Sequence, residues 1–151
     1  MFLDSAHAYD KVTRRSITGL IILFGKTPVF YYSKRQGAVK TSTYYAEFMK
    51  MRHAVEEVVA LRYMLRCLGV NVDTASAVYG DNLGVIQNAT IKNSLLKKKH
   101  VVIIYHKVRE AVAAGIIILI KIALTDNFAY CLNKSLPIAN HNWLINGIFY
   151  G

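Results

Sequence analysis

Acidic residues are scarce in this sequence, with nine Asp and Glu against nineteen Lys and Arg in 151 residues. The formal net charge is therefore +10. An excess of this size disfavours cationic partners and predicts an anionic one, nucleic acid first and a membrane surface second. A charge that serves only solubility is the alternative interpretation.

Cysteine and proline are also rare, with two of each. Cys67 and Cys131 lie in apolar, helix-like contexts and form no metal-ligand pattern. They are interpreted as reduced core residues of an intracellular protein. They do not indicate a particular compartment of the cell. The sequence also lacks repeats, low-complexity tracts and linkers. A single domain over residues 1–151 is therefore predicted.

Long hydrophobic runs are missing as well. The longest, residues 111–120, is well short of the roughly 20 residues that span a bilayer, so no membrane span is expected. The first ten residues, MFLDSAHAYD, lack a basic start followed by an apolar stretch, which argues against a secretory signal.

What the sequence does contain is 54% apolar residues, enough for a folded core. Strands are predicted at 2–8, 16–25, 27–34, 76–80 and 116–122. Helices are predicted at 43–68, 82–89, 97–115 and 127–133, followed by a C-terminal tail at 135–151. The early hairpin and the later alternation of strands and helices predict an α/β fold. Its mixed five-stranded sheet would have three antiparallel and two parallel strands and be flanked by helices.

Three carboxylates occupy comparable places in this pattern. Asp4 lies in the first strand, Glu47 on the apolar face of the long helix, and Asp81 at the end of the fourth strand. If the first and fourth strands are neighbours, the three acids converge, and clustered carboxylates repel unless a cation neutralises them. Oxygen ligands suit Mg²⁺ or Mn²⁺, and two such ions can drive phosphodiester hydrolysis.

Each acid also has an ordinary interpretation. Asp81 can cap the next helix, which spacing alone favours. Glu47 can pair with Lys50 or Arg52, and Asp4 can be a frayed surface acid. Taken singly, none of the three acids is a strong indication of a metal site.

Several stretches together resemble the ribonuclease H domain of copia-type (LTR) retrotransposon Pol polyproteins. They are LDSAHA from Leu3, TRRSITG from Thr13, SKRQGAVKTSTYYAEFM from Ser33, ALRYMLRCLGV from Ala60, YGDNLGVIQNA from Tyr79, KKHVVIIYHKVRE from Lys98 and KSLP from Lys134. The resemblance implies a ribonuclease H-like fold and two-metal cleavage of RNA in RNA–DNA hybrids. It also implies that Asp4, Glu47 and Asp81 are catalytic metal ligands.

The chain departs from that family near its C-terminus. The family's Ala-Asp pair reads Ala129-Tyr130 here, so the fourth carboxylate is replaced by a phenol, a poor Mg²⁺ ligand at neutral pH. Asp126, four residues earlier, is a candidate substitute ligand, although a role as N-cap of the helix from Asn127 is favoured. A degenerate or domesticated copy with weakened or lost hydrolysis is therefore expected.

Two functions remain open on these residues. The first is a ribonuclease H-type nuclease with Mg²⁺ or Mn²⁺ as cofactor. The second, without a cofactor, is a non-catalytic nucleic-acid-binding or structural component of a ribonucleoprotein or other assembly. In either case basic residues at the edges of elements are expected to contact phosphates without reading bases. These residues are Arg14, Arg15, Lys34, Arg35, Lys97, Lys98 and Lys99.

Overall fold

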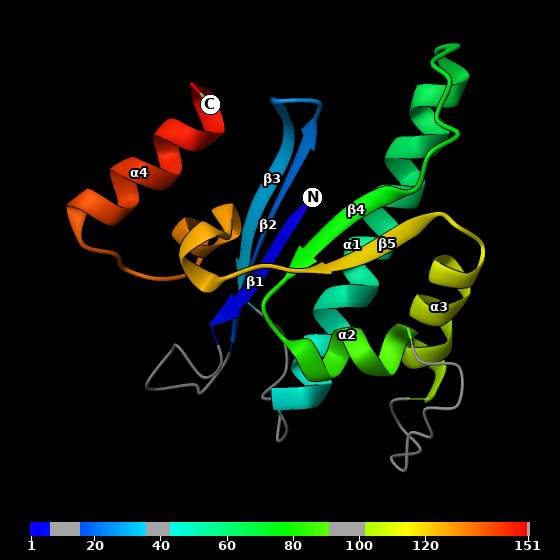
Figure 1. The fold of residues 1–151 in the computed structure, drawn as a ribbon, viewed down its shortest axis with the longest axis horizontal. Coiled ribbons are helices and arrows are strands. Elements are labelled where there is room, and N and C mark those ends of the chain that lie inside the picture. The colour runs from blue at the N-terminus through cyan, green and yellow to red at the C-terminus, as the bar shows by residue number, and fades with distance from the viewer. Residues whose placement is uncertain (7–15, 36–42, 91–101, 151) are drawn as a thin grey trace.

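A five-stranded mixed sheet forms the centre of the protein in the computed structural model, which describes residues 1–6, 16–35, 43–90 and 102–150. The strand order is β3-β2-β1-β4-β5 (Figure 1). β1 pairs antiparallel with β2 and parallel with β4, β2 pairs antiparallel with β3, and β4 pairs parallel with β5. The strands are β1 (Phe2–Ala6), β2 (Ile17–Phe24), β3 (Thr27–Arg35), β4 (Ser76–Gly80) and β5 (Ile117–Lys121).

Helices cover this sheet. The α-helices are α1 (Thr43–Cys67), α2 (Leu83–Thr90), α3 (Val102–Ala113) and α4 (Ile138–Phe149), and two 3₁₀ helices are η2 (Leu124–Asp126) and η3 (Phe128–Leu132). The predicted α/β class and the mixed five-stranded sheet are confirmed. The arrangement agrees with the ribonuclease H-like fold that the resemblance implies.

The C-terminal quarter differs from the prediction. The helix expected at 127–133 is instead the 3₁₀ helix η3, and the expected tail contains α4. Leu144 and Ile148, four residues apart, are buried on one face of α4. A Cβ on Gly147 would lie only 2.8 Å from the Phe128 ring, so α4 packs closely on η3. This contact, rather than a strong local pattern, explains the helix.

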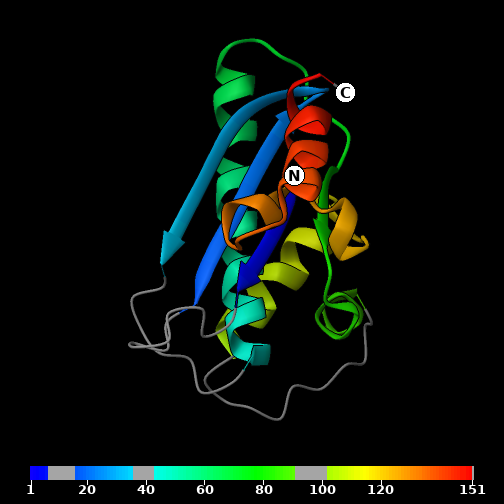
Figure 2. The ribbon, with the colours of Figure 1, turned by 90° about the vertical axis from the view of Figure 1, so that its left-hand side faces the viewer.

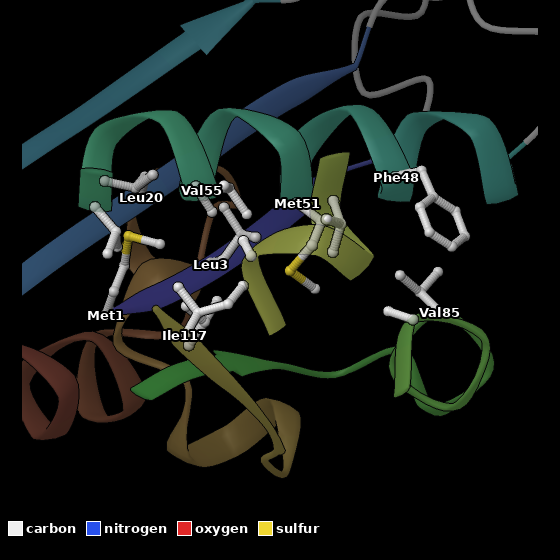
Figure 3. Close-up of a cluster of buried hydrophobic side chains, with 14 of the residues drawn as sticks. Met1, Leu3, Leu20, Phe48, Met51, Val55, Val85 and Ile117 are labelled. Atoms are coloured by element: carbon white, nitrogen blue, oxygen red, sulfur yellow. The ribbon is translucent and has the colours of Figure 1, made fainter. Parts of the chain in front are cut away.

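The two faces of the sheet are covered by different segments. Leu3 and Leu20 are cross-strand partners in β1 and β2, and both are fully buried in the cluster that α1 completes with Phe48, Met51 and Val55 (Figure 3). Phe2 points to the other face, where its ring lies 4.5 Å from that of Phe128 in η3. Alternation along β1 therefore sends neighbouring residues toward α1 and toward η3 and α4, which Figure 2 shows on opposite sides of the sheet.

A buried arginine fastens the end of α1 to the loop before β4. The Arg62 guanidinium donates to the carbonyl oxygens of Thr74 at 2.6 Å and Val72 at 2.8 Å, and to Ser76 Oγ at 3.1 Å. Only 8% of Arg62 is exposed. One side chain therefore binds two carbonyl oxygens of the loop and the hydroxyl group of Ser76 at the start of β4.

Replacing that arginine tests the role of this contact. Arg62→Met is expected to lower the free energy of unfolding by about 1–2 kcal/mol, because three acceptors lose a charged donor but partly regain water. Urea denaturation measures the change. Arg66→Met, one turn further along at an exposed position, is the matched control. Equal stability of the two variants would contradict the assigned role.

The two cysteines differ from their prediction as core residues. Both are free, but Cys67 is exposed, because it ends α1 where Met64 and Leu68 are also exposed. Cys131 is half-buried, and its thiol donates to the Phe128 carbonyl oxygen at 3.0 Å. Burial raises the pKa of the Cys131 thiol, which disfavours the reactive thiolate. In the described part of the chain, no helix has the length and apolar character needed to cross a membrane.

Candidate active site

The pairing of β1 with β4 sets the segments that carry Asp4 and Asp81 side by side. Phe2 of β1 is in parallel register with Tyr79 of β4, and each aspartate lies two residues further along its own segment. Asp4 and Asp81 therefore stand at the same level of adjacent strands, as expected if the first and fourth strands are neighbours.

Glu47 and Asp81 are joined by a buried lysine. Lys50 Nζ lies 2.5 Å from Glu47 Oε2 and 3.6 Å from Asp81 Oδ1. Only 1% of the Lys50 side chain is exposed. The contacts are ionic, since Lys50 Nζ makes no well-oriented hydrogen bond to any described residue. Of the two ordinary partners predicted for Glu47, Lys50 is confirmed, whereas Arg52 pairs with Glu56 at 2.9 Å.

Asp4 is contacted from the face of the sheet opposite to α1. It is 1% exposed, so its interpretation as a frayed surface acid is wrong. Asn133 Nδ2 donates to Asp4 Oδ2 at 2.9 Å, and Lys134 Nζ lies 3.6 Å from the same oxygen. Asp4 points toward η3 because it alternates with Leu3, which faces α1.

The segment that carries Asn133 and Lys134 is fixed to the sheet by its backbone and by side-chain amides. Asn127 Nδ2 donates to the Leu3 carbonyl oxygen at 2.9 Å, and Ser33 Oγ donates to the Leu132 carbonyl oxygen at 2.6 Å. Both contacts cross from η3 and its flanks to the strands. They place the two groups that contact Asp4.

The helix cap predicted at Asp81 lies one residue later. Asn82 Oδ1 accepts a hydrogen bond from Val85 N at 3.1 Å, so Asn82 is the capping residue of α2. The cap interpretation of Asp81 is therefore wrong. Asp81 directs its Oδ1 toward Lys50 instead.

Tyr130, where the resemblance implies a fourth carboxylate, contacts the same lysine as Asp4. Lys134 Nζ lies 4.2 Å from the centre of the Tyr130 ring. Asp126 is exposed and accepts a hydrogen bond from Thr125 Oγ1 at 3.2 Å. Its predicted role as the cap is wrong, because Asn127 itself accepts from Ala129 N at 3.1 Å. Asp126 and Tyr130 line a cavity of about 290 Å³ with Thr125, Asn140, Trp143 and Leu144.

The arrangement does not fit two divalent ions. Glu47 and Asp81 share an ammonium group where a bridging ion would have to lie, and Asp4 Oδ2 is occupied by Asn133 and Lys134. Among the residues that the structure describes, no three His, Cys, Asp or Glu side chains form a group that could hold a metal. The oxygens Asp4 Oδ1 and Asn133 Oδ1 are buried and have no hydrogen-bond partner in this part of the chain.

The sequence did not predict three residues as members of this site: Lys50, Asn133 and Lys134. Lys50 carried a signal, because it lies three residues after Glu47 on the same helix face. Asn133 and Lys134 carried none, since each is 129 or more residues from Asp4 in the chain.

The predicted phosphate contacts are only partly within the described residues. Lys34 and Arg35 are exposed at the end of β3. Arg14, Arg15 and the run Lys97–Lys99 lie outside the described residues.

Comparison with known proteins relates this chain to mobile elements. It is 27% identical over 135 residues to the retrovirus-related Pol polyprotein from transposon RE1 of Arabidopsis thaliana, covering 89% of this chain and 9% of that protein. It is 30% identical over 138 residues to the corresponding polyprotein from transposon TNT 1-94 of Nicotiana tabacum, covering 90% and 10%. The chain thus spans about a tenth of the length of these relatives. No model of a protein family matches it.

Proposed function

We propose that this chain is a ribonuclease H-like domain of retrotransposon origin that binds RNA–DNA hybrids or RNA and has lost most or all two-metal hydrolysis. The observation that carries the proposal is the buried ammonium of Lys50 between Glu47 and Asp81. An active two-metal site uses such carboxylates as ligands, and here both already contact the ammonium group of Lys50. Tyr130 at the fourth position supports the same conclusion, because a neutral phenol is a poor ligand for Mg²⁺.

Charge supports the binding part of the proposal. The chain carries +10 overall, and Lys34 and Arg35 are exposed at one end of β3. Lysine and arginine bind phosphates irrespective of base sequence, which suits a hybrid duplex or RNA as partner. A place in a larger ribonucleoprotein assembly inside the cell is compatible with such a protein.

An active nuclease is the second candidate, and one feature favours it. Asp4 and Asp81 each lie two residues after the paired residues Phe2 and Tyr79, at the same level of β1 and just past β4, and Asp4 Oδ1 has no hydrogen-bond partner among the described residues. A Mg²⁺ or Mn²⁺ ion that binds these acids tightly enough to displace Lys50 and Lys134 would restore a site for hydrolysis.

A cleavage assay on a labelled RNA–DNA hybrid separates the two candidates. With excess Mg²⁺ or Mn²⁺, the chain is expected to bind the hybrid and leave its RNA strand intact, because the metal ligands are already paired with ammonium groups. Binding is followed by gel shift and cleavage by denaturing gel.

Asp81→Asn is the control for contaminating nuclease. Metal-dependent cleavage that disappears in Asp81→Asn would overturn the proposed loss of hydrolysis. Cleavage that is equal in both preparations comes from a contaminant. Absence of hybrid and RNA binding would overturn the binding part of the proposal.

A further inference from the structure

We infer that Lys50 is a built-in cation that takes the place of a divalent ion between Glu47 and Asp81, so that these acids stay folded together without metal. The inference deepens the proposed function, on which it rests for the assignment of these acids to a former metal site. It also states that Lys50 weakens the binding of a divalent ion to these acids, which can be tested without nucleic acid.

The position of the Lys50 ammonium opposes binding of an ion between the same two acids. Lys50 Nζ is 2.5 Å from Glu47 Oε2 and 3.6 Å from Asp81 Oδ1. A Mg²⁺ ion bound to the same two oxygens would sit about 2.1 Å from each. It would then lie in contact with the ammonium, where both sterics and like charge oppose it. Binding of an ion between these acids therefore requires Lys50 to leave.

Burial makes that departure unfavourable. Lys50 is 1% exposed, and the Glu47 side chain is 10% exposed, so the pair is shielded from water. Removal of one partner from a buried ion pair leaves an uncompensated charge and is strongly destabilising. The placement of Lys50 three residues after Glu47 on α1 also fixes the two groups on one helix face.

Asp4 has neutralising groups of its own among the described residues. Lys134 and Asn133 contact Asp4 Oδ2 from the η3 side of the sheet, whereas Lys50 serves the other two acids from α1. Among the described residues, the three carboxylates thus contact two ammonium groups and one amide. These groups belong to the chain itself, and they approach from α1 on one face of the sheet and from the end of η3 on the other.

Titration with Mn²⁺, followed by the loss of the free-ion electron paramagnetic resonance signal, tests the inference. Lys50→Met keeps the unbranched stem of the side chain and removes its charged end. It is expected to bind Mn²⁺ at least about tenfold more tightly than the unmodified chain, because the acids lose their ammonium partner. Lys26→Met, at an exposed position in the turn between β2 and β3, removes the same charge and is expected to leave binding unchanged. Adding Asp81→Asn to Lys50→Met should abolish the gain.

The inference is overturned if the unmodified chain binds Mn²⁺ as tightly as Lys50→Met does, or if Lys26→Met produces the same gain. If Lys50→Met folds only with added Mn²⁺, measured by circular dichroism, the ion replaces the ammonium and the inference stands. If Lys50→Met does not fold even with Mn²⁺, the folding of the double variant Lys50→Met with Asp81→Asn is measured by circular dichroism. Recovery of folding supports Lys50 as the counter-charge, and continued failure to fold overturns it. Hybrid binding is measured separately, so failure here leaves the proposed binding function intact.

Discussion

The affinity of this chain for an RNA–DNA hybrid is expected to fall by about 100-fold between roughly 50 and 200 mM salt, as for a protein that neutralises about four phosphates. The reason is release of counterions from the nucleic acid when lysines and arginines replace them. The +10 charge of the chain makes such a contact its natural mode of binding. Fluorescence anisotropy at several salt concentrations gives the slope directly.

A pair of substitutions that removes two positive charges refines this prediction. Lys34→Gln together with Arg35→Gln is expected to reduce the logarithmic salt slope by about two, one for each lost phosphate contact. Lys26→Gln is the control, because Lys26 precedes β3 whereas Lys34 and Arg35 end it. An affinity that does not depend on salt, or a slope that changes equally in the control, would contradict phosphate binding at this edge.

Gly19→Ala is expected to lower the free energy of unfolding by about 2–3 kcal/mol, since overpacking a close contact costs this much. A Cβ at Gly19 would lie 2.7 Å from the Ala129 carbonyl oxygen and 3.0 Å from Leu132 Cβ. The obstructing oxygen belongs to backbone, which cannot swing aside as a flexible side chain does. The variant therefore forces η3 away from β2. Chemical denaturation measures the loss.

The matched control is Gly80→Ala on the neighbouring part of the sheet. A Cβ there would meet nothing closer than Met51 Cε at 3.8 Å, an ordinary contact. It is expected to change stability by less than about 1 kcal/mol. If Gly19→Ala and Gly80→Ala are equally stable, the close docking of η3 does not hold as described.

Gly19 also bears on the site, because it is the cross-strand partner of Asp4. The two residues point to the same face of the sheet, where η3 lies. A side chain at Gly19 would displace the segment that carries Asn133 and Lys134 from the Asp4 carboxylate. The absence of a side chain at this position is therefore part of how Asp4 becomes neutralised.

The fold was largely predictable because its signals are local. β4 was predicted at 76–80 and lies there, and the long helix that ends before Gly69 buries Met51, Ala54, Val55 and Val58 of its predicted apolar stripe, whereas Leu68 is exposed. Such periodicity depends only on neighbouring residues, so it survives without tertiary information. α4 was missed because its burial depends on Phe128, a residue of another element.

Of the candidate site, only the three acidic residues were predicted as site residues from the sequence, and the groups that contact Asp4 were not. Their residue types and positions in the chain indicated Asp4, Glu47 and Asp81, and the structure confirms that the strands before Asp81 and around Asp4 are neighbours. Their metal-binding role stays a prediction. Spacing could not decide whether Asp81 caps the next helix or belongs to a site, since Asn82 is an equally good cap one residue later.

By itself, the sequence determined the class of fold, the excess of positive charge and the three acids, because each follows from composition or from periodicity within one element. Only the tertiary structure decided what those acids contact. Lys50 became a buried counter-charge because the end of β4 brings Asp81 against α1. Asn133 and Lys134 reached Asp4 because η3 packs on the bare backbone of Gly19. Electrostatic energy depends on distance through space, and that distance is set by packing between elements rather than by position along the chain.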